Sequence, residues 1–215
     1  IIKNEIKKKN LIFLKTLKQK DTTISKLNSF ANLCKKAALE IKKYNPQIIL
    51  IYGDRGETLI TSFVAVNFNI PIAHFQGGDL SGNIDDIFRH SISKMSNYHF
   101  VSNQESKKNL IKLGEQKQNI FNVGELHIDT IKKIKFISWN NIKKNLNIKF
   151  NKKTKFVVFH YHPETYSNVD DFKVVKIILN SLLKKNYKII CIYPCSDIGF
   201  QSIIEKHIIC LFLMG

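Results

Sequence analysis

The chain has 215 residues, 44% of them hydrophobic, and a formal net charge of +17. Its lysines are scattered along the whole sequence with no arginine-rich stripe or aromatic–basic motif, so we do not expect a nucleic-acid partner. It has no apolar run of about 18 residues and no signal peptide. We therefore expect a protein without a membrane partner, in the cytoplasm.

The cysteine and histidine patterns do not predict a metal site. The four cysteines form no C-x-x-C pair and show no regular spacing. His160-Tyr161-His162 offers two imidazoles, but no ligand pattern nearby completes a site around them. We expect reduced thiols and no metal.

Helical and strand-like patterns alternate through the first two thirds of the chain. The expected helices span residues 30–44, 59–67, 85–96 and 105–113, and the expected strands span residues 47–52, 70–75, 98–102 and 120–123. Strands that alternate with helices of this length indicate right-handed βαβ units in a parallel sheet. The predicted fold class is α/β, with a Rossmann-like domain at residues 1–150.

The rhythm restarts after a segment rich in Asn and Lys, which we interpret as a helix and linker at residues 139–151. A strand at 155–160, a helix at 171–184, a strand at 187–193 and a helix near 202–207 follow. Two strands are too few for an independent sheet. Residues 151–215 are therefore interpreted as the start of a second parallel α/β domain, in a chain truncated at both ends.

Residues 74–90 hold the densest group of functional side chains. They contain three carboxylates, two histidines, one arginine and three glycines. The chain has only two arginines, Arg55 and Arg89, and both lie in or near such polar segments. Arginine used so sparingly points to roles that need a planar, forked cation, which lysine does not provide.

Three carboxylates are expected at one edge of the sheet, because ligands bind beyond the carboxyl ends of parallel strands. Asp54 and Asp79 follow two predicted strands, and Asp85 opens the next predicted helix. Clustered carboxylates suit acid/base chemistry, and the pair Gly77-Gly78 would let a ligand approach the backbone.

Simpler roles stay open for each of these residues. Asp85 could cap its helix or form an i,i+4 ion pair with Arg89, and Asp54 could be a turn residue. Three histidines are interpreted as hydrogen-bonded structural residues rather than catalysts: His74, His90 and His99.

These segments together resemble the UDP-N-acetylglucosamine 2-epimerases, specifically the hydrolysing branch of sialic-acid-type pathways. The similarity runs in order from about Asp21 to Glu205, and the block at 74–99 is the most specific part. The matching segments are residues 53–57, 74–103, 113–115, 121–124, 162–165 and 193–197.

The resemblance implies two Rossmann-like domains in the glycosyltransferase B arrangement, with a nucleotide sugar as substrate and a homo-oligomer when the chain is full length. The implied reaction converts UDP-N-acetylglucosamine and water to N-acetylmannosamine and UDP through a glycal, and no cofactor is implied. A sister branch acts on nucleotide-linked diacetylbacillosamine, and the motifs do not separate the two.

The resemblance also implies roles for particular residues. The implied catalytic residues are Asp54, Asp79, Asp85 and His162. Arg89 would hold Asp85 or contact the substrate, and His162 would assist departure of UDP or grip its phosphates. The further substrate-binding residues are Arg55, Glu57, His90, Ser196 and Asp197.

Four other interpretations stay open. A glycosyltransferase of the same fold would need an acceptor pocket, and a non-hydrolysing epimerase would keep UDP on the sugar. A non-enzymatic fragment would have no activity. A basic nucleic-acid binder would show salt-sensitive binding to any polyanion.

Overall fold

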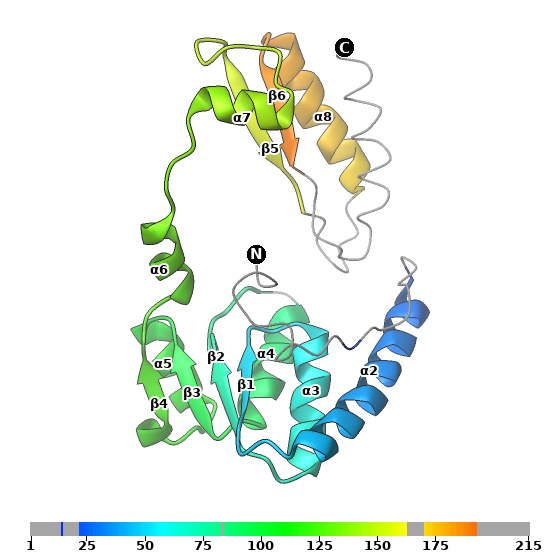
Figure 1. Cartoon of the computed structure of the whole chain (residues 1–215), viewed down its shortest axis with the longest axis vertical. Helices are drawn as coiled ribbons and strands as arrows, with labels where there is room; N and C mark the ends of the chain where they lie inside the picture. The colour runs from blue at the N-terminus through cyan, green and yellow to red at the C-terminus, as the bar shows by residue number, and fades with distance from the viewer. Residues whose placement is uncertain (1–13, 15–21, 83, 163–169, 193–215) are drawn as a thin grey trace. The chain divides into compact units, whose positions relative to one another are not determined.

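A computed structural model describes residues 14, 22–82, 84–162 and 170–192 of the chain. The chain divides into two compact units, with the main boundary between Lys132 and Lys133. We describe each unit by itself. Figure 1 shows the elements of both.

The first unit is built on a four-stranded parallel sheet in the order β1-β2-β3-β4. Its strands are β1 (Ile49–Tyr52), β2 (Ile72–Phe75), β3 (Tyr98–Val101) and β4 (Ile120–Asn122). Each predicted strand is present, shortened by one or two residues at one end. Because all three strand pairings are parallel, the carboxyl ends of the four strands lie along one edge.

Helices connect and flank these strands. They are α2 (Thr23–Tyr44), α3 (Gly56–Asn67), α4 (Ile84–Lys94), α5 (Gln104–Lys112) and the short 3-10 helix η2 (Lys117–Asn119). α2 begins seven residues before the prediction, and its buried residues recur at every fourth position from Ser29 to Ile41. Asn103 caps α5 by accepting a hydrogen bond from the Ser106 amide.

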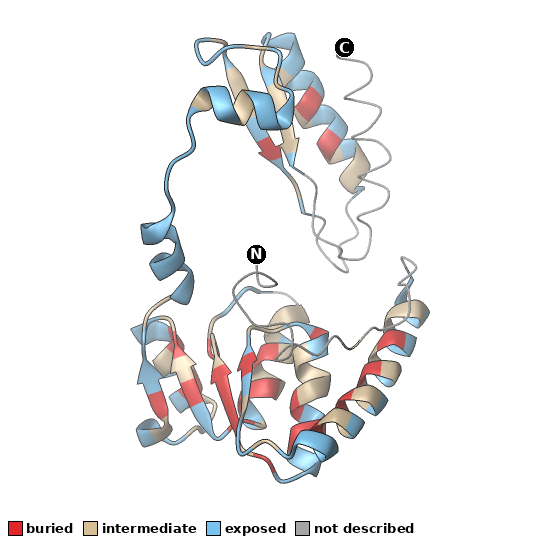
Figure 2. Ribbon diagram, in the orientation of Figure 1, coloured by how far each residue is buried: buried red, intermediate tan, exposed pale blue. Residues whose placement is uncertain are grey.

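The core of the first unit lies between the sheet and α3, α4 and α5. Ile51 and Ile72 of the sheet pack with Ala65 of α3 and Ile92 of α4. A second cluster joins the last two strands to α5 through Val101, Leu110 and Ile120. Figure 2 shows this burial along the strands and the inner helix faces. The strands are thus fixed from one side by packed helices.

The second unit contains α7 (Trp139–Leu146), β5 (Phe156–His160), α8 (Asp171–Lys184) and β6 (Lys188–Ile192). β5 and β6 pair in parallel, and Phe159 packs on Val175 and Leu179 of α8. The observed bounds of α8 are the predicted ones, residues 171–184. The α/β prediction is confirmed, whereas the predicted helix near 202–207 lies outside the described residues.

α6 (Leu126–Lys133) was not predicted. None of its residues is buried, and at eight residues it is shorter than the window in which helical periodicity is recognised. α7 groups with the second unit, although the sequence led us to expect the division after residue 150.

We predict that Gly78→Ala destabilises the first unit far more than Gly82→Ala. Both glycines have nearly the same positive φ, 81° and 79°, so both substitutions should cost about 1–2 kcal/mol of backbone strain. A Cβ on Gly78 would also collide with the Ser106 carbonyl oxygen and lie 2.9 Å from Leu110 Cγ, whereas one on Gly82 meets nothing within 4 Å.

The additional cost at Gly78 should be about 1–3 kcal/mol, the range for overpacking. Urea unfolding of the two variants and the unchanged chain measures it. Equal losses in both variants would contradict the close packing of Gly78 on α5.

Candidate active site

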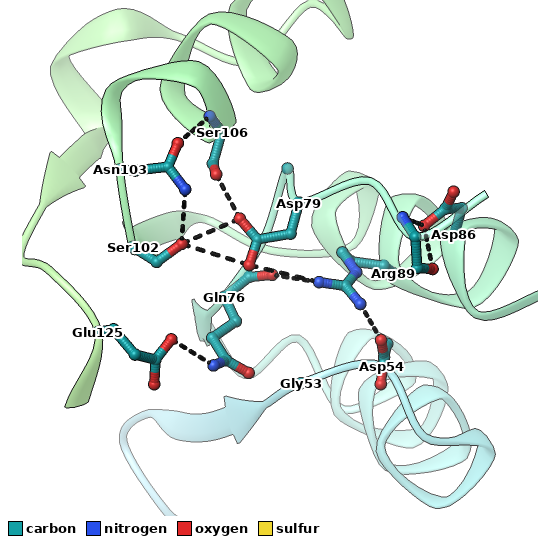
Figure 3. A network of polar contacts seen from close by, with 12 residues as sticks. Gly53, Asp54, Gln76, Asp79, Asp86, Arg89, Ser102, Asn103, Ser106 and Glu125 are labelled. Atoms are coloured by element: carbon teal, nitrogen blue, oxygen red, sulfur yellow. Dashed lines mark hydrogen bonds and ion pairs between the residues drawn. The ribbon is translucent and has the colours of Figure 1, made fainter. Parts of the chain in front are cut away.

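A guanidinium between two carboxylates forms the centre of the site (Figure 3). Arg89 of α4 bonds Asp54, which follows β1, through Nη2, and its Nη1 lies 3.5 Å from Asp79 Oδ2, beyond β2. Nη1 also donates to the Gln76 carbonyl at 3.4 Å. The Arg89 side chain is 10% exposed. The expected edge of the sheet therefore does hold Asp54, Asp79 and Arg89 together.

Two hydroxyl groups from the next βα turn fix Asp79. Ser102, directly after β3, donates to both carboxylate oxygens at 3.0 and 3.3 Å, and Ser106 in the first turn of α5 donates to Oδ1. Asp79 thus has hydrogen-bond donors on one side and the Arg89 cation on the other. A carboxylate held on both sides is pre-positioned for acid/base or charge-stabilising work.

The Gly77-Gly78 pair has a different purpose from the one we expected. A Cβ on Gly77 would lie 3.0 Å from both His74 Nδ1 and Ser93 Oγ, and one on Gly78 would collide with α5. The side-chain space at both positions is filled by the protein's own atoms. The glycines therefore let the loop after β2 pass close to α4 and α5, which places Asp79.

His74 and His99 are structural residues, as predicted. His74 is fully buried in β2, with Nε2 2.9 Å from the Gly53 carbonyl and Nδ1 3.1 Å from Ser93 Oγ. Burial lowers the pKa of His74 to about 4, so the neutral form joins the turn after β1 to α4. His99 lies 3.2 Å from Glu115, and burial likewise lowers its pKa.

A second polar cluster lies beside the first and was not anticipated. Glu125, three residues after β4, accepts hydrogen bonds from Gln76 Nε2 at 2.7 Å and from the Tyr52 hydroxyl at 3.2 Å. His127 Nδ1 lies 2.8 Å from Glu125 Oε1 and 2.9 Å from the Tyr52 hydroxyl. All four strands thus contribute polar groups to one edge, and Gln76 touches both clusters.

The other predicted residues fall in several places. Asp85 lies in the first turn of α4, one turn before Arg89, while its neighbour Asp86 accepts bonds from the amides of Ser81 and Gly82 at 2.7 Å. Arg55 and Glu57 are exposed at the start of α3.

His90 is half-buried on α4, and its Nδ1 is buried with no hydrogen-bond partner among the described residues. His162 is exposed in the second unit, two residues after β5, with its ring 4.1 Å from that of His160. Ser196 and Asp197 lie outside the described residues.

Comparison with known families places the chain in one group. Residues 7–210 match the family model described as UDP-N-acetylglucosamine 2-epimerase. The chain belongs to this epimerase family. The resemblance to this family, predicted from the motifs, is therefore confirmed.

Two similar relatives carry different names. A "UDP-N,N'-diacetylbacillosamine 2-epimerase (hydrolyzing)" of Legionella pneumophila is 36% identical over 76% of this chain and 44% of its own length. A "UDP-N-acetylglucosamine 2-epimerase" of Neisseria meningitidis is 29% identical over 75% of this chain and 42% of its own length. This epimerase-family chain thus spans less than half of these relatives.

Solved structures support the fold. The UDP-GlcNAc 2-epimerase from Neisseria meningitidis bound to UDP-GlcNAc matches with a TM-score of 0.67 at 19% identity, over 81% of this chain and 49% of that one. An epimerase from Methanocaldococcus jannaschii in complex with UDP-GlcNAc and UDP matches at 0.62 over 80% and 48%.

Two further findings concern only the part of the chain that the structure describes. Within it, no helix combines the length and the apolar character that crossing a membrane requires. Nor do three or more His, Cys, Asp or Glu side chains group there as metal ligands would.

Arg89→Met should cost about 3–5 kcal/mol of unfolding free energy, because it leaves Asp54 and Asp79 partly buried without their shared cation. Adding Asp54→Asn should recover part of this loss. Lys108→Met, which removes a cation from an exposed pair with Glu105, should change stability by less than about 1 kcal/mol. Urea unfolding measures all three, and a loss no larger than that of Lys108→Met would contradict the ion-pair assignment.

The lowered pKa of His74 predicts how the stability of the first unit depends on pH. Because the folded-state pKa is about 4, below the ordinary 6.5, the unfolded chain binds the proton first as pH falls. Stability is therefore fully present above pH 6.5 and is lost toward pH 4. The contribution from His74 should be roughly 2 kcal/mol between pH 7 and 5.

His74→Gln should remove this part of the pH dependence, whereas His127→Gln, at a side chain 67% exposed, should keep it. Urea midpoints at pH 7, 6 and 5 make the comparison. An unchanged slope in His74→Gln would show that the imidazole takes up a proton without unfolding.

Proposed function

We propose that this chain supplies the catalytic carboxylates of a hydrolysing 2-epimerase, which converts UDP-N-acetylglucosamine and water to N-acetylmannosamine and UDP. The observation that carries the proposal is the Asp54–Arg89–Asp79 arrangement at the carboxyl edge of the sheet, in a chain of this epimerase family. Oriented carboxylates are the groups that the reaction needs.

The proposed reaction has two stages. In the first, a base removes the C2 proton while the C1–O bond to UDP breaks, which gives a glycal and free UDP. In the second, water adds across the double bond, with hydroxyl at C1 and a proton delivered to C2 from the opposite face. Positive charge develops at C1 during elimination, so a carboxylate near the ring lowers that barrier.

The contacts of Asp79 support its role, and the family resemblance supplies the roles of Asp85 and His162. Asp79 is held by Ser102, Ser106 and Arg89, and a rigid carboxylate suits stabilisation or proton transfer at the sugar. Asp85, at the start of α4, is assigned the complementary acid/base role. His162 of the second unit is assigned to the departing UDP.

A second candidate substrate is UDP-linked N,N'-diacetylbacillosamine, with the same chemistry. It is favoured by the higher identity of the Legionella pneumophila relative, 36%, against 29% for the Neisseria meningitidis relative. One difference between the two sugars is the group at C4, an acetamido group in diacetylbacillosamine and a hydroxyl in N-acetylglucosamine, so competition between them in one reaction discriminates the candidates.

Proton NMR in D2O tests the function. We expect free UDP together with N-acetylmannosamine that carries deuterium at C2. Asp79→Asn should lower turnover by about 100-fold or more, the usual contribution of a proton-transfer group. Asp129→Asn, at an exposed carboxylate of α6, should leave turnover unchanged.

Because the chain spans less than half of its relatives, the assay should also use a chimera joined to the remaining part of the Legionella pneumophila relative. A chimera that retains UDP on a 2-epimerised sugar would exclude hydrolysis. A chimera that turns over neither sugar would exclude the proposed function.

A further inference from the structure

Gln76 joins the two polar clusters at the edge of the sheet. Its backbone carbonyl accepts a hydrogen bond from Arg89 Nη1 at 3.4 Å, and its side-chain Nε2 donates to Glu125 Oε2 at 2.7 Å. Its backbone is left-handed, with φ +63°. A non-glycine residue held in this region is uncommon and is concentrated at functional sites. Gln76 therefore occupies a constrained position directly beside the Asp54–Arg89–Asp79 group.

Glu125 determines the orientation of the Gln76 side-chain amide, with its NH2 group toward Glu125. A carboxylate accepts hydrogen bonds and does not donate them, so it selects the NH2 group of Gln76. Glu125 is also a strong acceptor: the hydrogen bond from Gln76, with those from His127 and Tyr52, lowers its pKa to about 2. At neutral pH it is ionised, and the orientation of the amide is fixed by charge-assisted bonding.

The amide oxygen consequently points away from Glu125, toward the turn after β1 (Figure 3). Gln76 Oε1 lies 3.9 Å from the position that a Cβ on Gly53 would occupy, next to Asp54. In the described part of the chain no donor is bonded to this oxygen. Gln76 thus presents an acceptor beside Gly53, the residue that precedes Asp54.

We propose that Gln76 is a substrate-binding residue whose amide oxygen accepts a hydrogen bond from a hydroxyl or acetamido N–H of the nucleotide sugar, and that Glu125 is the positioning residue that enforces this polarity. This inference rests on the proposed function for the identity of the ligand. Neither Gln76 nor Glu125 belongs to the Asp54–Arg89–Asp79 group, so the inference adds one substrate contact and one positioning residue to it.

The proposal explains why a carboxylate lies opposite Gln76. An amide opposite an amide can pair in either orientation, so the site would present oxygen and NH2 alternately. A site that must recognise a donor on the sugar would lose affinity in the flipped state. An ionised carboxylate removes that state, and the recognition is preorganised before substrate arrives.

Glu125→Gln is the first test, because it keeps the shape and removes the enforced polarity. We expect KM to rise about 5- to 20-fold with kcat changed by less than about threefold, the effect of one misdirected neutral hydrogen bond in the ground and transition states alike. Glu105→Gln is the matched control, because the Glu105 side chain on α5 is 65% exposed. It should change neither KM nor kcat.

A reciprocal exchange provides the rescue. Gln76→Glu alone places two carboxylates opposite each other and should weaken binding more than Glu125→Gln does. The double variant Gln76→Glu/Glu125→Gln restores one donor facing one acceptor and again presents an oxygen toward Gly53. Its KM should return to within about threefold of the parent value, and a KM that stays raised although the urea midpoint recovers would contradict the recognition role.

The amide resonances of Gln76 separate this inference from the proposed function. The assay uses the chain and the chimera described above, with UDP-N-acetylglucosamine or the diacetylbacillosamine analogue as probe. Binding that shifts the Gln76 side-chain 15N–1H2 signals without UDP release supports the contact while rejecting the reaction. Turnover with an unchanged KM in Glu125→Gln, or binding of neither probe, would overturn the inference.

Discussion

The Arg89 guanidinium is the interaction on which the rest of the site depends. It is buried, and it contacts Asp54 after β1, Asp79 after β2 and the Gln76 carbonyl. Desolvating this cation is costly unless carboxylates compensate it, so the turns after β1 and β2 must close on α4. The same contacts hold two carboxylates near each other, and the positive charge of Arg89 offsets the repulsion between them. The ion pairs of Arg89 with Asp54 and Asp79 thus both stabilise the first unit and position the carboxylates of the site.

Much of this geometry could be predicted from the sequence, because parallel βαβ units bring strand ends to one edge. That rule located Asp54 and Asp79, and the scarcity of arginine singled out Arg89. The partner of Arg89 was harder to find. Sequence spacing suggested Asp85, one helical turn away, but the described ion pairs of Arg89 go to residues 35 and 10 positions earlier. Such long-range pairs depend on how the loops fold back, which no local spacing encodes.

Gln76, Ser102, Ser106 and Glu125 were not predicted for a related reason. Each is an ordinary polar residue when taken alone, and each gains its role from a neighbour on another strand. Glu125 lies 49 positions from its partner Gln76. The two residues meet only because the sheet brings the ends of β2 and β4 to the same edge. The Gly77-Gly78 pair gave the opposite error: the sequence signal was real, but its cause was packing against α4 and α5 rather than access for a ligand.

Gln76 also connects recognition with chemistry. Its carbonyl bonds the arginine that holds Asp54 and Asp79, and its amide bonds Glu125, so the two polar clusters share one residue with a constrained backbone. A movement of Gln76 would therefore disturb Arg89 at the same time. Since the backbone at φ +63° leaves little freedom for a compensating shift, the orientation of the amide and the position of the guanidinium are coupled. Substrate contacts made at this amide would then act on a site whose carboxylates are already in place.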